Sequence, residues 1–127
     1  MFALVADVAA YPQFMPWCGG ASAQTQDDGA VRARINIHLG GVRSAFTTLN
    51  RHQRDKRIDM AFVEGPFTSL TGCWNFSALA ADACKVEFVL DYEFASGLAG
   101  RVIAPVFDAI AASFVDAFSL RAEALYG

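Results

Sequence analysis

Few side chains in this sequence combine the residue types and the spacing that catalysis requires. A nucleophile needs a base within hydrogen-bond reach. His38 falls on the outward face of a predicted strand and His52 in a predicted charged turn, and neither has a well-placed serine or cysteine nearby. We interpret both histidines as surface residues. The three cysteines, Cys18, Cys73 and Cys84, lack the spacing of metal ligands and indicate reduced thiols in a cytoplasmic protein. We therefore predict no catalytic residue and no metal site.

Polar residues on otherwise apolar faces are better candidates for a binding site. Ser44, Thr48 and Asn50 share a predicted strand face with Phe46. They indicate either the end of a strand or polar groups inside an apolar pocket, which is how small-ligand sites are commonly built. Arg121 lies near the middle of the apolar face of the last predicted helix. It either extends its charge to solvent from the last turns or donates a hydrogen bond to a ligand head group.

Basic residues are concentrated in one segment of a chain whose net charge is −3. Residues 32–57 hold seven basic side chains and one acidic side chain, whereas the rest holds three basic and twelve acidic ones. The basic residues are Arg32, Arg34, Arg43, Arg51, Arg54, Lys56 and Arg57. They form either a solvated sheet face or a patch for phosphate, from RNA backbone or lipid head groups. The only aromatic ring among them is predicted to face the other way, so contact with the backbone is favoured over base stacking.

The longest regular element is predicted at residues 96–126, an amphipathic helix of about 40 Å at ~1.5 Å per residue. Its apolar face holds Val102, Ile103, Val106, Phe107, Ile110, Phe114, Phe118 and Leu125. Pro105 removes one backbone hydrogen bond and is expected to kink the axis. A bent helix across a curved sheet can enclose a cavity.

The remainder of the chain predicts a short helix over Met1–Val8, a helical turn within 11–20 and about six strands. Turn signals at 27–29 and at Gly40–Gly41, and a loop at 79–83, define the hairpins. A highly charged turn is predicted from Arg51 to Arg57. The predicted pairs are Thr25–Val31, Ala23–Ala33, Ala21–Ile35, Leu39–Val42, Ile35–Phe46, Ala78–Cys84, Phe76–Val86, Trp74–Phe88, Asn75–Glu87, Cys73–Val89, Thr71–Asp91 and Leu70–Tyr92. The Cys73–Val89 pair argues against a Cys73–Cys84 disulfide.

These elements predict an α+β domain over residues 1–127, an antiparallel sheet with the helices on one face. The sequence is 54% hydrophobic and 18% charged, which excludes a disordered chain. Charged residues interrupt the last helix, so we interpret it as a core helix and not as a membrane span. The N-terminal apolar run lacks a basic leader and a cleavage site, so it does not indicate a signal peptide.

Several stretches taken in order resemble one family. They are Tyr11-Pro-x-Phe-x-Pro-Trp-Cys18, Gly65-Pro-Phe67, Gly72-x-Trp74-x-Phe76, Cys84-Lys-Val-x-Phe88 and Pro105-Val-Phe107 with Ala117-Phe118. Together they resemble the coenzyme Q-binding and polyketide cyclase-like family of START-related proteins. The resemblance implies a helix-grip fold with a lipid-sized cavity. For mitochondrial relatives it implies ubiquinone binding. For bacterial toxin-type relatives it implies binding to the large ribosomal subunit and a block of subunit association.

Members of that family begin with a strand before the first helix, whereas this sequence starts within the helix. We therefore expect the strand around Val86–Phe94 to be an exposed sheet edge, which Glu87, Asp91 and Glu93 would protect from aggregation.

The leading interpretation is a non-enzymatic protein that binds a polyprenyl quinone or similar lipid as its hydrophobic ligand. The predicted ligand-binding residues are Phe46, Met60, Phe62, Trp74, Phe88, Tyr92, Val106, Ile110, Phe114 and Arg121. The first alternative is a ribosome-directed toxin that acts through the basic segment, and a weaker one is an enzyme of the cyclase/dehydrase type. No cofactor is expected other than a bound ubiquinone or lipid. The expected partners are a quinone, the large ribosomal subunit or an anionic membrane surface, and not DNA.

Overall fold

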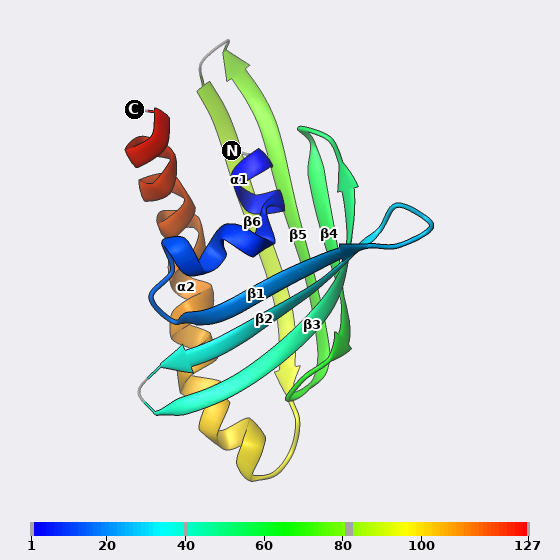
Figure 1. The fold of residues 1–127 in the computed structure, drawn as a ribbon, viewed down its shortest axis with the longest axis vertical. Helices are drawn as coiled ribbons and strands as arrows, with labels where there is room; N and C mark the ends of the chain where they lie inside the picture. Colours follow the sequence, from blue (N-terminus) through cyan, green and yellow to red (C-terminus); the bar gives the residue numbers. More distant parts are fainter. Residues whose placement is uncertain (1, 40, 81–82, 127) are drawn as a thin grey trace.

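The computed structural model describes residues 2–39, 41–80 and 83–126 (Figure 1). Two short helical segments, α1 and η1, come before six strands, and one long helix, α2, follows them. Their bounds are α1 Phe2–Ala6, η1 Val8–Gln13, β1 Cys18–Thr25, β2 Val31–Leu39, β3 Val42–Gln53, β4 Arg57–Glu64, β5 Phe67–Ala80, β6 Ala83–Phe94 and α2 Leu98–Tyr126. The fold is thus α+β, as predicted from the sequence.

The six strands form one antiparallel sheet in the order β1-β2-β3-β4-β5-β6. Every strand pair predicted from the sequence is present in the observed register. The strands of the last hairpin extend to Ala80 and from Ala83, so the connection is shorter than predicted. Gly40 of the predicted Gly40–Gly41 turn and residues 81 and 82 of the predicted loop lie outside the described residues.

The charged turn between β3 and β4 is shorter than predicted. The strand β3 continues to Gln53 and β4 begins at Arg57, and Lys56 N–H donates to Gln53 O at 2.9 Å across the turn. The prediction of a turn from Arg51 was wrong because charge density was taken as a sign of irregular structure. An alternating strand with one solvated face accommodates the same charges. Consequently Arg51 points outward and His52 points toward the core side.

The helix α2 lies along the concave side of the sheet and curves with it (Figure 1). Five residues of its predicted apolar face are at most 5% exposed, namely Ile103, Phe107, Ile110, Phe114 and Phe118. Val102 and Leu125 are 45% and 49% exposed, so the prediction was wrong at these two positions. They lie toward the two ends of the helix, whereas the five buried positions lie between them. By length and composition residues Gly100–Leu125 meet the criteria for a membrane span, but the helix packs its apolar face on the sheet.

The segments α1 and η1 cover one end of the space between the sheet and α2 (Figure 1). Val5, Val8 and Tyr11 are buried there, and Tyr11 OH donates to Val5 O at 2.5 Å. Tyr11 also packs edge-on against Phe118 of α2, with 5.3 Å between ring centroids. The N-terminal segment is therefore fixed to both the helix and its own first turn.

The strands β1 and β6 are the two edges of the sheet among the described residues. The expectation of an edge strand around Val86–Phe94 is confirmed. Glu87, Asp91 and Glu93 are exposed along β6, which disfavours pairing with another neutral or acidic strand.

Candidate functional site

A small cavity lies between the concave sheet face, the N-terminal helical segments and α2. Its volume is about 20 Å³, room for roughly one water molecule. It is lined by Val5, Val8, Tyr11, Ile35, Phe46, Thr48, Asn50, His52, Ile58, Met60, Leu70, Trp74, Leu90, Phe107 and Phe114. Because these residues come from both helical layers and from five of the strands, the cavity exists only in the assembled fold.

One polar pair interrupts the apolar wall. Thr48 Oγ1 donates to Asn50 Oδ1 at 2.7 Å, and the two residues are 1% and 5% exposed. Asn50 lines the cavity, and no hydrogen bond donated by its Nδ2 is present among the described residues. The amide can therefore donate to an acceptor atom placed in the cavity.

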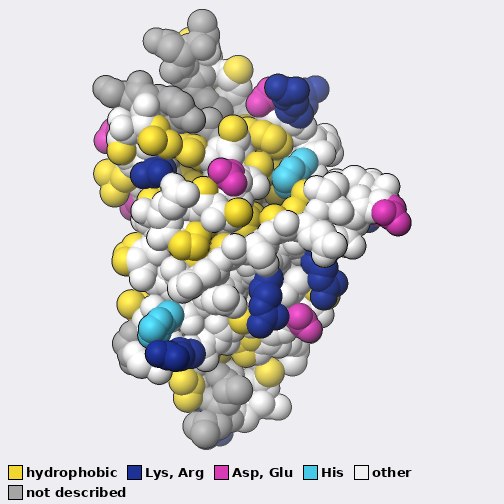
Figure 2. Space-filling view, viewed as in Figure 1, with side chains coloured by type: hydrophobic (Ala, Val, Ile, Leu, Met, Phe, Trp, Pro, Cys, Tyr) yellow, Lys and Arg dark blue, Asp and Glu magenta, His cyan; other side chains and the backbone are white. Residues whose placement is uncertain are grey.

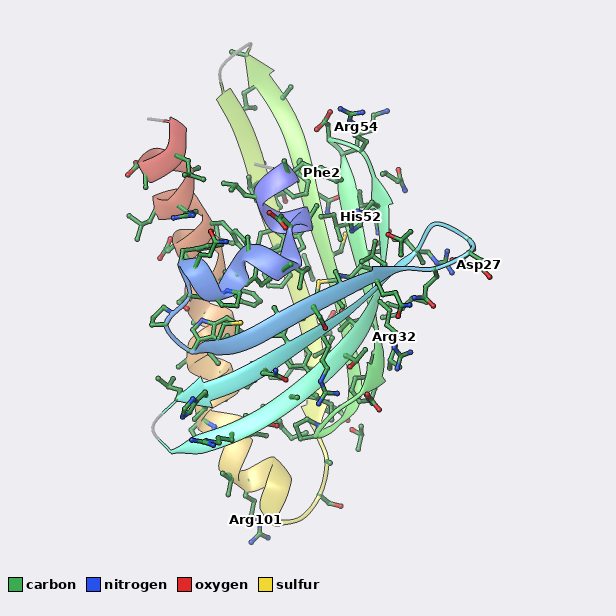
Figure 3. The ribbon with its side chains drawn as sticks, in the orientation of Figure 1. Phe2, Asp27, Arg32, His52, Arg54 and Arg101 are labelled. Carbon is green, nitrogen blue, oxygen red and sulfur yellow. The ribbon has the colours of Figure 1, made fainter. Side chains whose placement is uncertain are left out.

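His52 continues the polar strip on the same side of β3. Its ring is half-buried and meets Phe2 of α1 edge-on, with 5.8 Å between ring centroids (Figure 3). Burial lowers the pKa of His52, which favours the neutral imidazole. The interpretation of His52 as a surface residue in a turn was wrong because β3 continues through it. Alternation along β3 turns its side chain inward.

The described residues that line the cavity carry no formal charge. None of them is an aspartate, glutamate, lysine or arginine, and burial raises the pKa of Tyr11, which keeps the phenol protonated. An uncompensated charged group would lose its hydration there without gaining an ionic partner. The site therefore suits a neutral, mainly apolar molecule that presents one or two hydrogen-bond acceptors.

The structure brings four of the predicted ligand-binding residues to the cavity: Phe46, Met60, Trp74 and Phe114. The other predicted positions, Phe62, Phe88, Tyr92, Val106, Ile110 and Arg121, do not line it. Phe88 stacks behind Trp74 with 4.2 Å between ring centroids, and Ile110 is buried in the core.

Two of these positions connect α2 to the rest of the fold. Tyr92 OH donates to Asp108 Oδ1 at 2.5 Å. Desolvation and, after it, this hydrogen bond raise the pKa of Tyr92 to about 12. Arg121 donates to Gln13 Oε1 at 3.3 Å, and its guanidinium lies 5.2 Å from the ring centre of Phe14. Arg121 therefore contacts η1, outside the cavity lining.

Sequence reasoning missed cavity residues of two kinds. Val5, Val8 and Tyr11 come from the N-terminal helices, whose docking position no local pattern specifies. Phe107 and Ile58 belong to faces correctly predicted as apolar, but nothing in their periodicity distinguishes a cavity wall from solid core. Thr48 and Asn50 carried a usable signal, because they are polar residues at inward positions of β3.

The basic segment is interspersed with carboxylates in the folded chain. Arg32 and Arg34 lie 4.0 and 3.5 Å from Glu64, both measured between guanidinium nitrogen and carboxylate oxygen. The ion pairs Arg51–Asp28, Arg54–Asp55 and Arg57–Asp59 measure 3.0, 3.9 and 2.8 Å. Figure 2 shows the basic side chains as separate groups, several of which have an acidic neighbour. Three of the four acids lie outside residues 32–57, so the charge count along the sequence overstated the local positive charge.

No cluster of three or more metal-ligating side chains is present in the described part of the chain. Cys18 and Cys73 are free thiols, and burial raises the pKa of each. Protonated thiols are poor nucleophiles.

An antiparallel sheet that grips a long C-terminal helix over an apolar cavity defines a START-like, helix-grip protein. Over residues 1–119 the chain matches the family described as polyketide cyclase / dehydrase and lipid transport. The chain belongs to this family.

Relatives across the family carry different functional names. The "Persistence and stress-resistance toxin PasT" of Escherichia coli O6:H1 is 40% identical over 126 residues, which cover 99% of this chain and 80% of the relative. The "Ribosome association toxin RatA" of Pseudomonas aeruginosa is 38% identical, covering 100% of this chain and 88% of the relative. The "Coenzyme Q-binding protein COQ10 homolog B, mitochondrial" of Xenopus laevis is 28% identical and covers 100% of this chain and 54% of the relative.

Solved structures support the fold assignment. A START superfamily protein from Mycobacterium smegmatis has a TM-score of 0.78 at 22% identity and covers 98% of this chain and 88% of that one. The Zhui aromatase/cyclase from Streptomyces has a TM-score of 0.80 at 16% identity, with 96% and 84% covered. At these identities the likeness concerns the fold alone.

Proposed function

We propose that this protein binds a neutral hydrophobic ligand of the polyprenyl quinone type in the cavity beneath α2. The observation that carries the proposal is the Thr48–Asn50 pair, with a free amide donor in an uncharged, aromatic-walled cavity. A quinone carbonyl is a neutral acceptor on a flat apolar ring and fits that chemistry. A relative named for coenzyme Q binding aligns with the full length of this chain.

A ligand of this size requires the cavity to expand. At about 20 Å³ the present volume is far below the ~300–1,000 Å³ of typical ligand pockets. We interpret the structure as the closed state. Burying ~400 Å² of apolar ligand surface would contribute roughly 10 kcal/mol at ~25 cal/mol per Å². Association and reopening costs would leave affinity in about the micromolar range.

A matched pair of leucine variants tests the proposal. Leu90 lines the cavity, whereas Leu79 on the preceding strand is 67% exposed and lies away from it. Leu90→Phe adds volume where the ligand would sit, and Leu79→Phe adds the same volume at the surface. Titration with a short-chain ubiquinone, read by quenching of the combined fluorescence of Trp17 and Trp74, should show weaker binding for Leu90→Phe and unchanged binding for Leu79→Phe. Absence of saturable quenching in the wild type would refute the proposal.

The second candidate is association with ribosomes, favoured by relatives named for it that are 38–39% identical over nearly the whole chain. The outer sheet face, opposite the cavity, carries the exposed arginines through which such contact would occur. Ribosomal subunits incubated with the protein and sedimented at rising salt should retain it at low salt and release it steeply as salt increases. Leu90→Phe should bind subunits as the wild type does, because the two surfaces are separate. Failure of the wild type to co-sediment at low salt would refute this candidate and leave ligand binding intact.

A further inference from the structure

Arg43 differs from the other strand arginines in its electrostatic surroundings. Arg32, Arg34, Arg51 and Arg57 each lie within 4.0 Å of a carboxylate. No ion pair to Arg43 is present among the described residues, and the side chain is exposed. Its positive charge is therefore available to an external anion.

Arg43 borders a hollow at the end of the sheet where β2 turns into β3. The hollow has a volume of about 410 Å³ and is lined by Gly19, Asn36, Ile37, His38, Arg43 and Ser44. His38 and Arg43 are direct partners in the β2–β3 register. In Figure 2 a histidine and one basic side chain lie side by side on the lower left of the face shown.

Two glycines keep the hollow open. A β-carbon at Gly19 would lie 3.2 Å from His38 Cβ, and one at Gly20 would lie 3.0 Å from Asn36 Nδ2. Both distances are shorter than ordinary van der Waals contacts, so the side chains of His38 and Asn36 occupy the space that a β-carbon at Gly19 or Gly20 would need. The register irregularity of β1 falls between Cys18 and Gly20, at the same place. The shape of the hollow is thus built into the backbone of β1.

The polar groups around the hollow are suited to an anion. Arginine offers a planar fork of N–H donors, and asparagine and histidine on the same sheet face each add a donor. Among the described residues, no carboxylate lines the hollow. Arginine forks match the geometry of phosphate oxygens in particular.

We propose that this hollow binds a backbone phosphate of RNA, with Arg43 as the ionic anchor and Asn36 and His38, which share its sheet face, as neighbouring donors. The proposal deepens the second candidate function and rests on it for the source of the phosphate. RNA is favoured over a lipid head group because the residues that share a face with Arg43 are largely polar, and Gly20, Ser22 and Arg34 continue that face. Leu39 at the end of β2 is 41% exposed, but a single apolar side chain provides little apolar area for insertion into a bilayer.

Two charge reversals test the site. Arg43→Glu changes the hollow, and Arg54→Glu makes the same charge change at the opposite end of β3, where Arg54 is exposed and paired only with Asp55 (Figure 3). In RNA duplex titrations Arg43→Glu should weaken binding about tenfold or more and reduce the salt dependence by roughly one phosphate contact. Arg54→Glu should alter affinity no more than about threefold. Arg43→Lys should fall between wild type and Arg43→Glu, because it retains the charge and loses the fork.

A binding measurement without the ribosome separates the two proposals. Inorganic phosphate added to the isotope-labelled protein should shift the amide resonances of Gly19, Asn36, His38 and Arg43, and these shifts should vanish in Arg43→Glu. Phosphate binding without co-sedimentation would refute ribosome association and leave the hollow as an anion site. Co-sedimentation that Arg43→Glu and Arg54→Glu reduce equally would overturn the hollow and leave ribosome association intact. Arg43-dependent binding to phosphatidylglycerol vesicles, with RNA not bound, would overturn the assignment to RNA.

Discussion

The contribution of the Thr48–Asn50 pair to protein stability and its contribution to quinone binding can be measured separately. Both residues are nearly fully buried and make one hydrogen bond to each other. A buried neutral hydrogen bond contributes about 1 kcal/mol net. Leaving one partner unpaired costs about 1–3 kcal/mol, whereas replacing both by apolar groups of the same shape is nearly neutral or stabilising.

We therefore expect Asn50→Leu alone to lower the free energy of unfolding by about 1–3 kcal/mol, since the Thr48 hydroxyl loses its acceptor. The melting temperature should fall by roughly 4 °C per kcal/mol for a domain of this size. The double variant Thr48→Val with Asn50→Leu should recover wild-type stability or exceed it. A complete cycle of four proteins, unfolded in urea and followed by tryptophan fluorescence, measures the coupling between the two residues.

Although the double variant should be at least as stable as the wild type, it should bind the quinone more weakly. The double variant loses one donor to the quinone, about 1 kcal/mol, which corresponds to roughly fivefold weaker binding. A ring of the same size without carbonyl oxygens should bind wild type and double variant equally. A double variant that is less stable than wild type by about 2 kcal/mol or more, with quinone affinity unchanged, would show that the pair serves the fold and not a ligand.

Three further outcomes follow from the same structure. Burial lowers the pKa of His52 in the folded protein, so as pH falls below about 6.5 the imidazole is protonated more readily in the unfolded chain. The free energy of unfolding should therefore decline in that pH range. In urea titrations at several pH values, His52→Gln should lack this part of the decline. Tyr92→Phe should lower the free energy of unfolding by about 1 kcal/mol, because the hydrogen bond to Asp108 is lost. The folded pKa of Tyr92 is about 12, so the wild type should lose stability between about pH 10 and 12, and urea titrations should show that Tyr92→Phe lacks this loss. Gly65→Ala should lower stability by about 2 kcal/mol or more, measured by thermal melting, since φ is 146° and the new β-carbon would lie 2.8 Å from Phe46 Cβ; unchanged melting would contradict the backbone geometry there.

The fold could be predicted in detail because local patterns specify it. Alternation in β5 and β6, with the hairpin between them, set a register that puts Trp74 opposite Phe88, and a one-residue slip would have turned every apolar side chain outward. The long helix followed from its apolar stripe. Its ends were overestimated because periodicity marks which face is apolar and not how far the sheet beneath it extends. Val102 and Leu125 illustrate that limit.

The site was less predictable because it depends on contacts between distant segments. Glu64 approaches Arg32 and Arg34 of β2 only after β4 has paired with the intervening strand β3, and Asp28 reaches Arg51 from the β1–β2 hairpin. No count along the chain can include these pairs. His52 was assigned to a turn because of its charged neighbours, although strand alternation predicts an inward side chain once β3 is extended by two residues.

The central claim is that the closed cavity holds a neutral quinone-type ligand, and native mass spectrometry tests it most directly. The wild-type protein and the Leu90→Phe and Leu79→Phe variants would be purified from a quinone-producing host under identical mild conditions. Their bound lipids would then be extracted and identified. The wild type and Leu79→Phe should each carry about one quinone per chain, and Leu90→Phe should carry much less. Ligand-free wild-type protein, or equal amounts of lipid on all three proteins, would contradict it.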